Sequence, residues 1–298
     1  MAICRAVGYN LAREGSSVKG HTMTSAQYAK WDARLETLLR RLASIFVVLV
    51  WSSAIFFGLY ILLLYIGAYF VGDLARWNHG ASELYVEGMP MATGGIGIHF
   101  LAGAIILLLG SVQLIERVRN RHPGFHRWVG RIYVVASILT ALGGIAFIVL
   151  HGTIGGPVMN VGFFLYGLLM AVAAVETVRH ARAERTEGHR AWALRLYVLA
   201  IGSWLYRMEY GFWFLFTGGV GSTPNLTGPF DQVMAFFFYL APLAVLEFVL
   251  RSRYKASSLG MKAFASVALL MATLLLLLMT LIFVFEVWGP AIWELERV

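Results

Sequence analysis

The sequence has little charge and almost no cysteine. Only 13% of its 298 residues are Asp, Glu, Lys or Arg, whereas soluble domains carry roughly 25%. The single cysteine, Cys4, excludes an intramolecular disulfide and a cysteine-based metal site. A nucleophile elbow, a Walker motif and a metalloprotease helix are also missing from the sequence. The first forty residues are polar and basic, so we expect no cleavable signal peptide.

Long apolar runs dominate the rest of the chain. Hydrophobic residues make up 59% of it, and seven segments reach the ~20 residues that an α-helix needs to cross a bilayer. These segments cover residues 44–72, 94–115, 130–152, 157–178, 194–216, 231–250 and 263–288. The runs are continuously apolar and do not alternate, which favours helices over barrel strands. The fold class is therefore predicted as an all-α polytopic transmembrane bundle of about seven helices.

The cations are concentrated in four segments that such a bundle places on one side. Lys and Arg number 24. All but Arg76, Arg207 and Arg297 belong to the segment before the first run or to the connections that join the second run to the third, the fourth to the fifth and the sixth to the seventh. The positive-inside rule makes that side cytoplasmic. We therefore expect a cytoplasmic N-terminus and an outer C-terminus. This distribution explains the net charge of +8 without a nucleic-acid partner.

The pattern divides the chain into four parts. Residues 1–43 form a cytoplasmic N-terminal arm, 44–72 the first transmembrane helix, 94–250 a helical core, and 263–298 the last transmembrane helix with a short outer tail. Within the arm, residues 25–42 have apolar side chains at three- or four-residue intervals, which predicts a short amphipathic helix. It would lie on the inner leaflet or dock to a partner subunit.

Two of the cytoplasmic connections resemble each other. Each has a His-Arg pair, at 126–127 and 189–190, followed by Arg-x-Tyr-Val, at 131–134 and 195–198. Duplication of a two-helix hairpin explains this pattern, and chance likeness of two basic loops remains the alternative.

The same residues resemble a known family. HRWVGRIY (126–133), HRAWALRLY (189–197), His99, Gln113 and Arg207 are similar to a bacterial multi-pass membrane family called domain of unknown function 2306, over about residues 95–250. The resemblance implies an integral membrane protein, and it assigns no activity.

Histidines are the main candidates for a cofactor site. The expected topology places His99 and His151 near the outer face and His126 and His189 near the inner face. Imidazoles on facing helices hold haem b in membrane bundles. The sequence therefore raises haem b as a cofactor, with His99 and His151 as outer iron ligands and His126 and His189 as an inner pair. The simpler interpretation of the inner pair is contact with lipid headgroups. A metal other than haem iron at the outer pair would need a carboxylate, from Glu83 or Glu87.

Charged residues inside the apolar runs are a second group of candidates. Arg207 lies within the fifth run, and an arginine there costs ~2.5–3.5 kcal/mol on insertion scales. It would bind a haem propionate, a quinone oxygen or a lipid phosphate, or snorkel outward together with Glu209. Glu247 is expected to pair with Arg195 or Gln113. The glycines at 94, 95, 97, 143 and 144 predict close helix packing.

Two classes of function follow. The first is a haem b-binding redox protein, in which Arg207 holds a propionate or a quinone. The second is a non-redox membrane protein: a transporter, a lipid-binding protein or an accessory subunit of a membrane complex. Membrane lipids, and further membrane subunits or a quinone, are the expected partners. The expected location is the cytoplasmic (inner) membrane of a bacterium. No large extramembrane domain is present to bind a water-soluble substrate.

Overall fold

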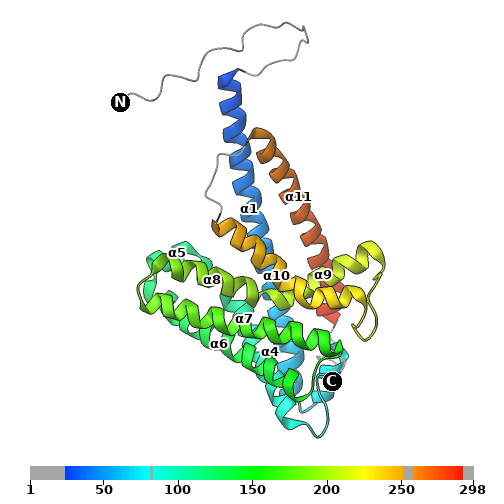
Figure 1. Cartoon of the computed structure of the whole chain (residues 1–298). Coiled ribbons are helices and arrows are strands. Elements are labelled where there is room, and N and C mark those ends of the chain that lie inside the picture. Colours follow the sequence, from blue (N-terminus) through cyan, green and yellow to red (C-terminus); the bar gives the residue numbers. More distant parts are fainter. Residues whose placement is uncertain (1–23, 81–82, 252–257, 291–298) are drawn as a thin grey trace.

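The computed structural model describes residues 24–80, 83–251 and 258–290. In these residues the chain forms helices and turns without strands, as predicted for a membrane bundle (Figure 1). Six of the helices are long and apolar enough to cross a membrane. The helical polytopic fold is therefore confirmed.

The first long helix, α1 (Ser25–Ile61), begins at a capping box. The Thr24 side chain accepts a hydrogen bond from the Gln27 backbone, and the Gln27 side chain accepts one from the Thr24 backbone. The π-helical turn η1 (Leu62–Ile66) and the short α2 (Gly67–Phe70) extend it. The predicted amphipathic segment is thus present, but it is continuous with the first span. Because one straight helix cannot both lie in the leaflet and cross it, this segment leaves the bundle as an extension of α1.

The remaining helices follow in chain order. They are η2 (Leu74–Arg76), α3 (Trp77–Gly80), α4 (Pro90–Leu114), α5 (Glu116–Arg121), α6 (Pro123–Leu150), α7 (Gly156–Arg182), α8 (Thr186–Ala200), α9 (Gly202–Thr217), α10 (Pro229–Arg251), α11 (Leu259–Ile282) and η3 (Phe283–Trp288). Pro at the first turn of α4, α6 and α7 suits their N-termini, where the missing N–H is not needed.

The fifth expected span, residues 194–216, is divided between α8 and α9. These helices have 15 and 16 residues and are separated by Ile201. The hydroxyl of Tyr166 donates a 2.5 Å hydrogen bond to the carbonyl oxygen of Leu199 at this break. Gly202 makes room for it, since a Cβ there would lie 2.8 Å from the Tyr166 hydroxyl. A side chain inserted into the helical hydrogen-bond ladder is a known cause of such a break.

The core of the bundle depends on close contact between α4 and α6. A Cβ on Gly143 would lie 2.6 Å from the carbonyl oxygen of Gly95, so neither helix could approach this closely with a larger residue. This confirms the packing role predicted for Gly95 and Gly143, whereas a Cβ on Gly94 would meet nothing within 4 Å. α7 packs on α6, and α8 and α10 pack on α7.

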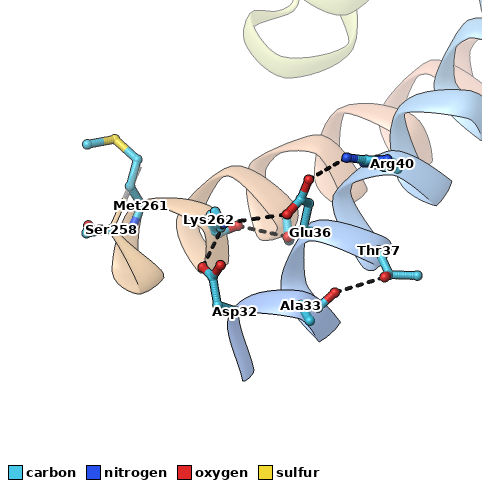
Figure 2. A network of polar contacts seen from close by, with 9 residues as sticks. Asp32, Ala33, Glu36, Thr37, Arg40, Ser258, Met261 and Lys262 are labelled. Carbon is cyan, nitrogen blue, oxygen red and sulfur yellow. Dashed lines mark hydrogen bonds and ion pairs between the residues drawn. The ribbon is translucent and has the colours of Figure 1, made fainter. Parts of the chain in front are cut away.

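α1 and α11 form a parallel pair that crosses this core (Figure 1). The hydroxyls of Ser53 in α1 and Thr280 in α11 lie 3.0 Å apart, and Trp204 of α9 donates to the same Ser53 oxygen. Toward the start of both helices, Lys262 forms a 2.7 Å ion pair with Asp32 and lies 3.9 Å from Glu36 (Figure 2). Polar contacts near Ser53 and near Lys262 therefore hold α1 and α11 together, in addition to apolar packing.

Candidate functional site

A small polar cavity lies where the α1–α11 pair meets the core. Residues from α1, η1, α4, α6, α7, α8 and α9 line it. They are Phe57, Ile61, Tyr65, His99, Phe100, Gly103, Ile106, Thr140, Tyr166, Met170, Ala200, Ser203 and Arg207. Two of the residues predicted from the sequence, His99 and Arg207, therefore meet at one site.

Arg207 supplies the charge of the cavity. Its guanidinium donates one hydrogen bond, 3.0 Å long, to the carbonyl oxygen of Ser203 in its own helix. The guanidinium carbon also lies 4.6 Å from the centre of the Phe57 ring, a cation–π contact. Among the ion pairs of the described residues none involves Arg207. Most of its five N–H donors are therefore available to a ligand.

His99 faces Arg207 across the cavity. Its Nδ1 lies 2.8 Å from the carbonyl oxygen of Thr140 in α6, which fixes the plane of the ring. Gly144 allows this position, because a Cβ there would be 2.8 Å from the same Nδ1. With Nδ1 bonded to the backbone, Nε2 is the nitrogen that can serve a ligand in the cavity.

Aromatic residues complete the wall. Tyr65 is almost fully buried and stacks on Phe100, with ring centres 4.0 Å apart. Its carbonyl oxygen accepts a 2.8 Å hydrogen bond from the buried Trp77 indole. Tyr65, Phe57 and Phe100 thus line the cavity with aromatic rings, of which Phe57 lies against the guanidinium. Tyr166 and Thr140 also line it, and their hydroxyls donate to backbone carbonyls.

The size of the cavity limits what it can hold. Its volume is about 50 Å³, enough for a few water molecules. Pockets that enclose a whole cofactor have roughly 300–1,000 Å³. The cavity therefore suits a single charged or polar group, such as a carboxylate or phosphate, and a haem does not fit inside it.

His151 does not join His99. It follows the last residue of α6, where its ring packs on Phe147 with centres 5.2 Å apart. His99 contacts α6 at Thr140 and Gly144. At 1.5 Å per residue, the seven residues from Gly144 to His151 separate the two histidines by about 10 Å along the helix. No contact joins the two imidazoles in the described residues. A metal site of three or more His, Cys, Asp or Glu side chains is likewise not found in the part of the chain that the structure describes.

His126, near the start of α6, and His189, near the start of α8, both lie at the opposite end of the core. Nδ1 of His189 lies 3.0 Å from the carbonyl oxygen of Thr177 in α7. Nδ1 of His126 is buried without a hydrogen-bond partner. The amide of Gln113 donates a 3.4 Å hydrogen bond to the backbone of His126.

The other predicted charges have different surroundings. Glu247 of α10 pairs with Arg195 of α8 at 2.5 Å, which confirms one of the two expected partners. Arg195 also lies over the Trp192 ring. One carboxylate oxygen of Glu209 is buried without a hydrogen-bond partner in the described residues. Glu247 therefore joins two helices, whereas Glu209 carries an unsatisfied polar atom.

Sequence reasoning missed Tyr65, Tyr166 and Thr140, which lie inside apolar runs and share no spacing with His99 or Arg207. It also missed Asp231. This fully buried carboxylate accepts hydrogen bonds from the Tyr210 and Ser222 hydroxyls and from the backbone of Thr223 and Gly228. The sequence pattern that could have identified Asp231 is a single acidic residue in the first turn of an apolar helix. Such a residue indicates a cap, which here orders the α9–α10 loop.

Comparison with known families gives one match. A family model described as "Predicted membrane protein (DUF2306)" matches residues 96–249, which is more than half of the chain. This range contains α4 to α10 except for the ends of the first and last of these helices. Comparison with curated proteins and with solved structures gives no match.

Proposed function

The chain belongs to the DUF2306 family of predicted membrane proteins, and we propose that it binds an anionic group of a lipid-soluble ligand at Arg207, inside the bundle. It is then a non-redox membrane protein of the transporter or lipid-binding class. The observation that carries this proposal is a guanidinium within the helical bundle that has no carboxylate partner in the described residues and that lines a cavity with both polar and apolar walls.

The energetics favour a bound anion. An arginine inside the hydrocarbon region costs several kcal/mol unless it is paired or hydrated. One carbonyl and one aromatic face satisfy Arg207 only in part. A carboxylate or phosphate would accept two parallel hydrogen bonds from the guanidinium, the strongest pairing available to it. His99 and Tyr166 line the same cavity, but their protons are used by the carbonyl oxygens of Thr140 and Leu199, so the hydrogen bonds to the anion would come from Arg207.

A thermal-shift titration tests the proposal. Monododecyl phosphate and dodecanoate are added to the full chain in dodecyl maltoside, with 1-dodecanol as the uncharged control. A ligand at 100 times its Kd stabilises by about 2.7 kcal/mol, which raises Tm by about 5 °C in a protein of this size. We expect this rise with an anionic probe, and which probe acts distinguishes a phosphate site from a carboxylate site.

Two variants make the test specific. Arg207→Gln should abolish the rise, because it removes the charge and most donors. Arg76→Gln is the matched control, because Arg76 pairs with Asp73 outside the core. An equal rise with dodecanol, or in Arg207→Gln, would contradict the proposal.

A haem b redox role is the second candidate, and its support is now confined to the inner histidines. His126 and His189 lie at the same end of the core on different helices, and the Thr177 carbonyl orients His189 as second-shell partners orient metal-bound imidazoles. These two side chains would supply the axial ligands, and the haem would supply one-electron transfer, with a quinone as a lipid-soluble partner. A reduced-minus-oxidised spectrum of the purified chain tests this directly. Sharp alpha and Soret bands that disappear in His189→Ala would establish the role, and a flat spectrum would end it.

The location remains part of the proposal. The concentration of cations in the N-terminal arm and in three connections supports a cytoplasmic N-terminus in a bacterial inner membrane. Alkaline phosphatase fused after residue 298 should be active, because this enzyme folds only outside the cytoplasm. An inactive fusion would place the C-terminus inside.

A further inference from the structure

Tyr133 and Tyr197 approach the same glycine from two different helices. Both belong to the repeated Arg-x-Tyr-Val sequence, Tyr133 in α6 and Tyr197 in α8. A Cβ on Gly110 of α4 would lie 3.2 Å from Cε2 of each ring. The two copies of the motif therefore place equivalent tyrosines together.

The polar atoms at this point lie close together without well-formed hydrogen bonds, with the Tyr197 hydroxyl near the hydroxyl of Ser111 and the indole of Trp51. The hydroxyls of Ser111, Tyr133 and Tyr197 are all buried, and in the described structure none has a hydrogen-bond partner. The side chains of Ser111 and Tyr133 belong to residues that are only 5% exposed. Buried polar groups without a partner cost about 1–3 kcal/mol each. Three such groups around one glycine indicate a ligand that donates and accepts hydrogen bonds, and water is the usual one.

This hydroxyl cluster lies between the two sites already described. On one side, Tyr133 belongs to the same buried cluster as Ile106, Tyr166 and Met170, which line the Arg207 cavity. On the other side, Gln113 follows Ser111 by two residues in α4, and its amide bonds to the backbone of His126. On α6 polar residues recur about every two helical turns, at His126, Tyr133 and Thr140, whereas on α4 more than three turns separate His99 from Ser111.

We propose that Ser111, Tyr133 and Tyr197 hold internal water, and that this water site is the middle of a hydrated path from the His126–His189 end to the Arg207 cavity. Water and protons reach the intramembrane cavity by this path. The inference does not rest on what binds at Arg207, because none of its three hydroxyl groups lines that cavity. It gives the duplicated motif a common role, which is to place one hydroxyl from each hairpin at the centre of the path.

Thiol accessibility tests the path. Ser111→Cys is made in a Cys4→Ser background, so that the full chain contains one thiol. The solubilised protein is then treated with 2-aminoethyl methanethiosulfonate, and labelling is followed by mass spectrometry. Because this reagent attacks thiolates, and a thiol ionises only where water reaches it, we expect modification of Cys at position 111.

Ser53→Cys in the same background is the matched control. Ser53 is also buried in the bundle, but its hydroxyl is satisfied by Trp204 and Thr280. We expect labelling at 111 to be on the order of tenfold faster than at 53. Equal, slow rates at both positions in folded protein would overturn the proposal.

Hydroxyl-radical footprinting of the unmodified chain decides the question if Ser111→Cys does not fold. Radiolysis of internal water oxidises neighbouring aromatic rings, so Tyr133 and Tyr197 should be modified. Trp204 is intrinsically more reactive, but it is 2% exposed and its indole is bonded to Ser53, so it should be protected. Oxidation of Trp204 without oxidation of the two tyrosines would contradict a hydrated cluster.

Discussion

The imidazole of His99 is held by the backbone of Thr140, whose carbonyl oxygen lies 2.8 Å from Nδ1. The contact joins α4 to α6 at the wall of the Arg207 cavity. It also directs the second ring nitrogen away from α6, because the two nitrogens of an imidazole point in different directions. Any change that moves α6 against α4 therefore moves His99 relative to Arg207.

Gly144→Ala tests this dependence. The added methyl group would lie 2.8 Å from Nδ1 of His99 and would displace the ring from Thr140. We expect a loss of about 1–3 kcal/mol in stability, together with weaker stabilisation by the anionic probe. Thermal unfolding with and without monododecyl phosphate measures both effects. Gly94→Ala is the control, because its Cβ meets nothing within 4 Å, and an equal loss in both variants would contradict the steric explanation.

Tyr166→Phe should destabilise the protein at the break between α8 and α9. The variant keeps the ring but removes the hydrogen bond to the Leu199 carbonyl. A buried carbonyl left without its partner costs about 1–3 kcal/mol, which should appear as a lower Tm. Tyr69→Phe is expected to have no effect, because Tyr69 is 62% exposed. An unchanged Tm in Tyr166→Phe would show that another group satisfies Leu199.

Glu247→Gln should loosen the contact between α8 and α10. Glu247 accepts from Arg195 at 2.5 Å and lies 3.3 Å from Arg251, and its side chain is 29% exposed. A partly exposed pair is worth up to about 1 kcal/mol, and salt weakens it. The difference in Tm from the parent should therefore shrink in high salt. Glu116→Gln is the comparison, because Glu116 pairs with Arg119 while 76% exposed; if it destabilises as much, burial of the pair has no influence.

Lys262→Met should separate the N-terminal ends of α1 and α11. The ammonium of Lys262 contacts both Asp32 and Glu36, and the variant leaves these two carboxylates without a cation between them (Figure 2). We expect a loss of about 1 kcal/mol or less. Lys30→Met is the control, because Lys30 is exposed on α1, two residues before Asp32, and forms no ion pair within the described residues. Cross-linking of cysteines placed at positions 33 and 259 reports whether the helix ends move apart, and unchanged cross-linking would show that apolar packing alone holds them.

Periodicity and composition determined the class of protein. Long apolar runs can cross a bilayer only as helices or barrels, and their lack of alternation left helices. The glycines at 95 and 143 and the pair Arg195–Glu247 were also identified, because both depend on short-range rules of size and charge. The family resemblance rested on residues that the family match covers.

Which polar residues meet inside the bundle was decided only by the tertiary structure. The sequence placed His99 and His151 near the same membrane face, but the depth of each side chain depends on how α4 lies against α6. The sequence identified Arg207 as a charge within an apolar run. It could not identify the neighbours Tyr65 and Tyr166, because they come from helices far away in the chain. The repeat predicted two similar hairpins without showing that Tyr133 and Tyr197 share one glycine. Helix rotation and crossing set these contacts, and both follow from the packing of whole helices, which no local pattern encodes.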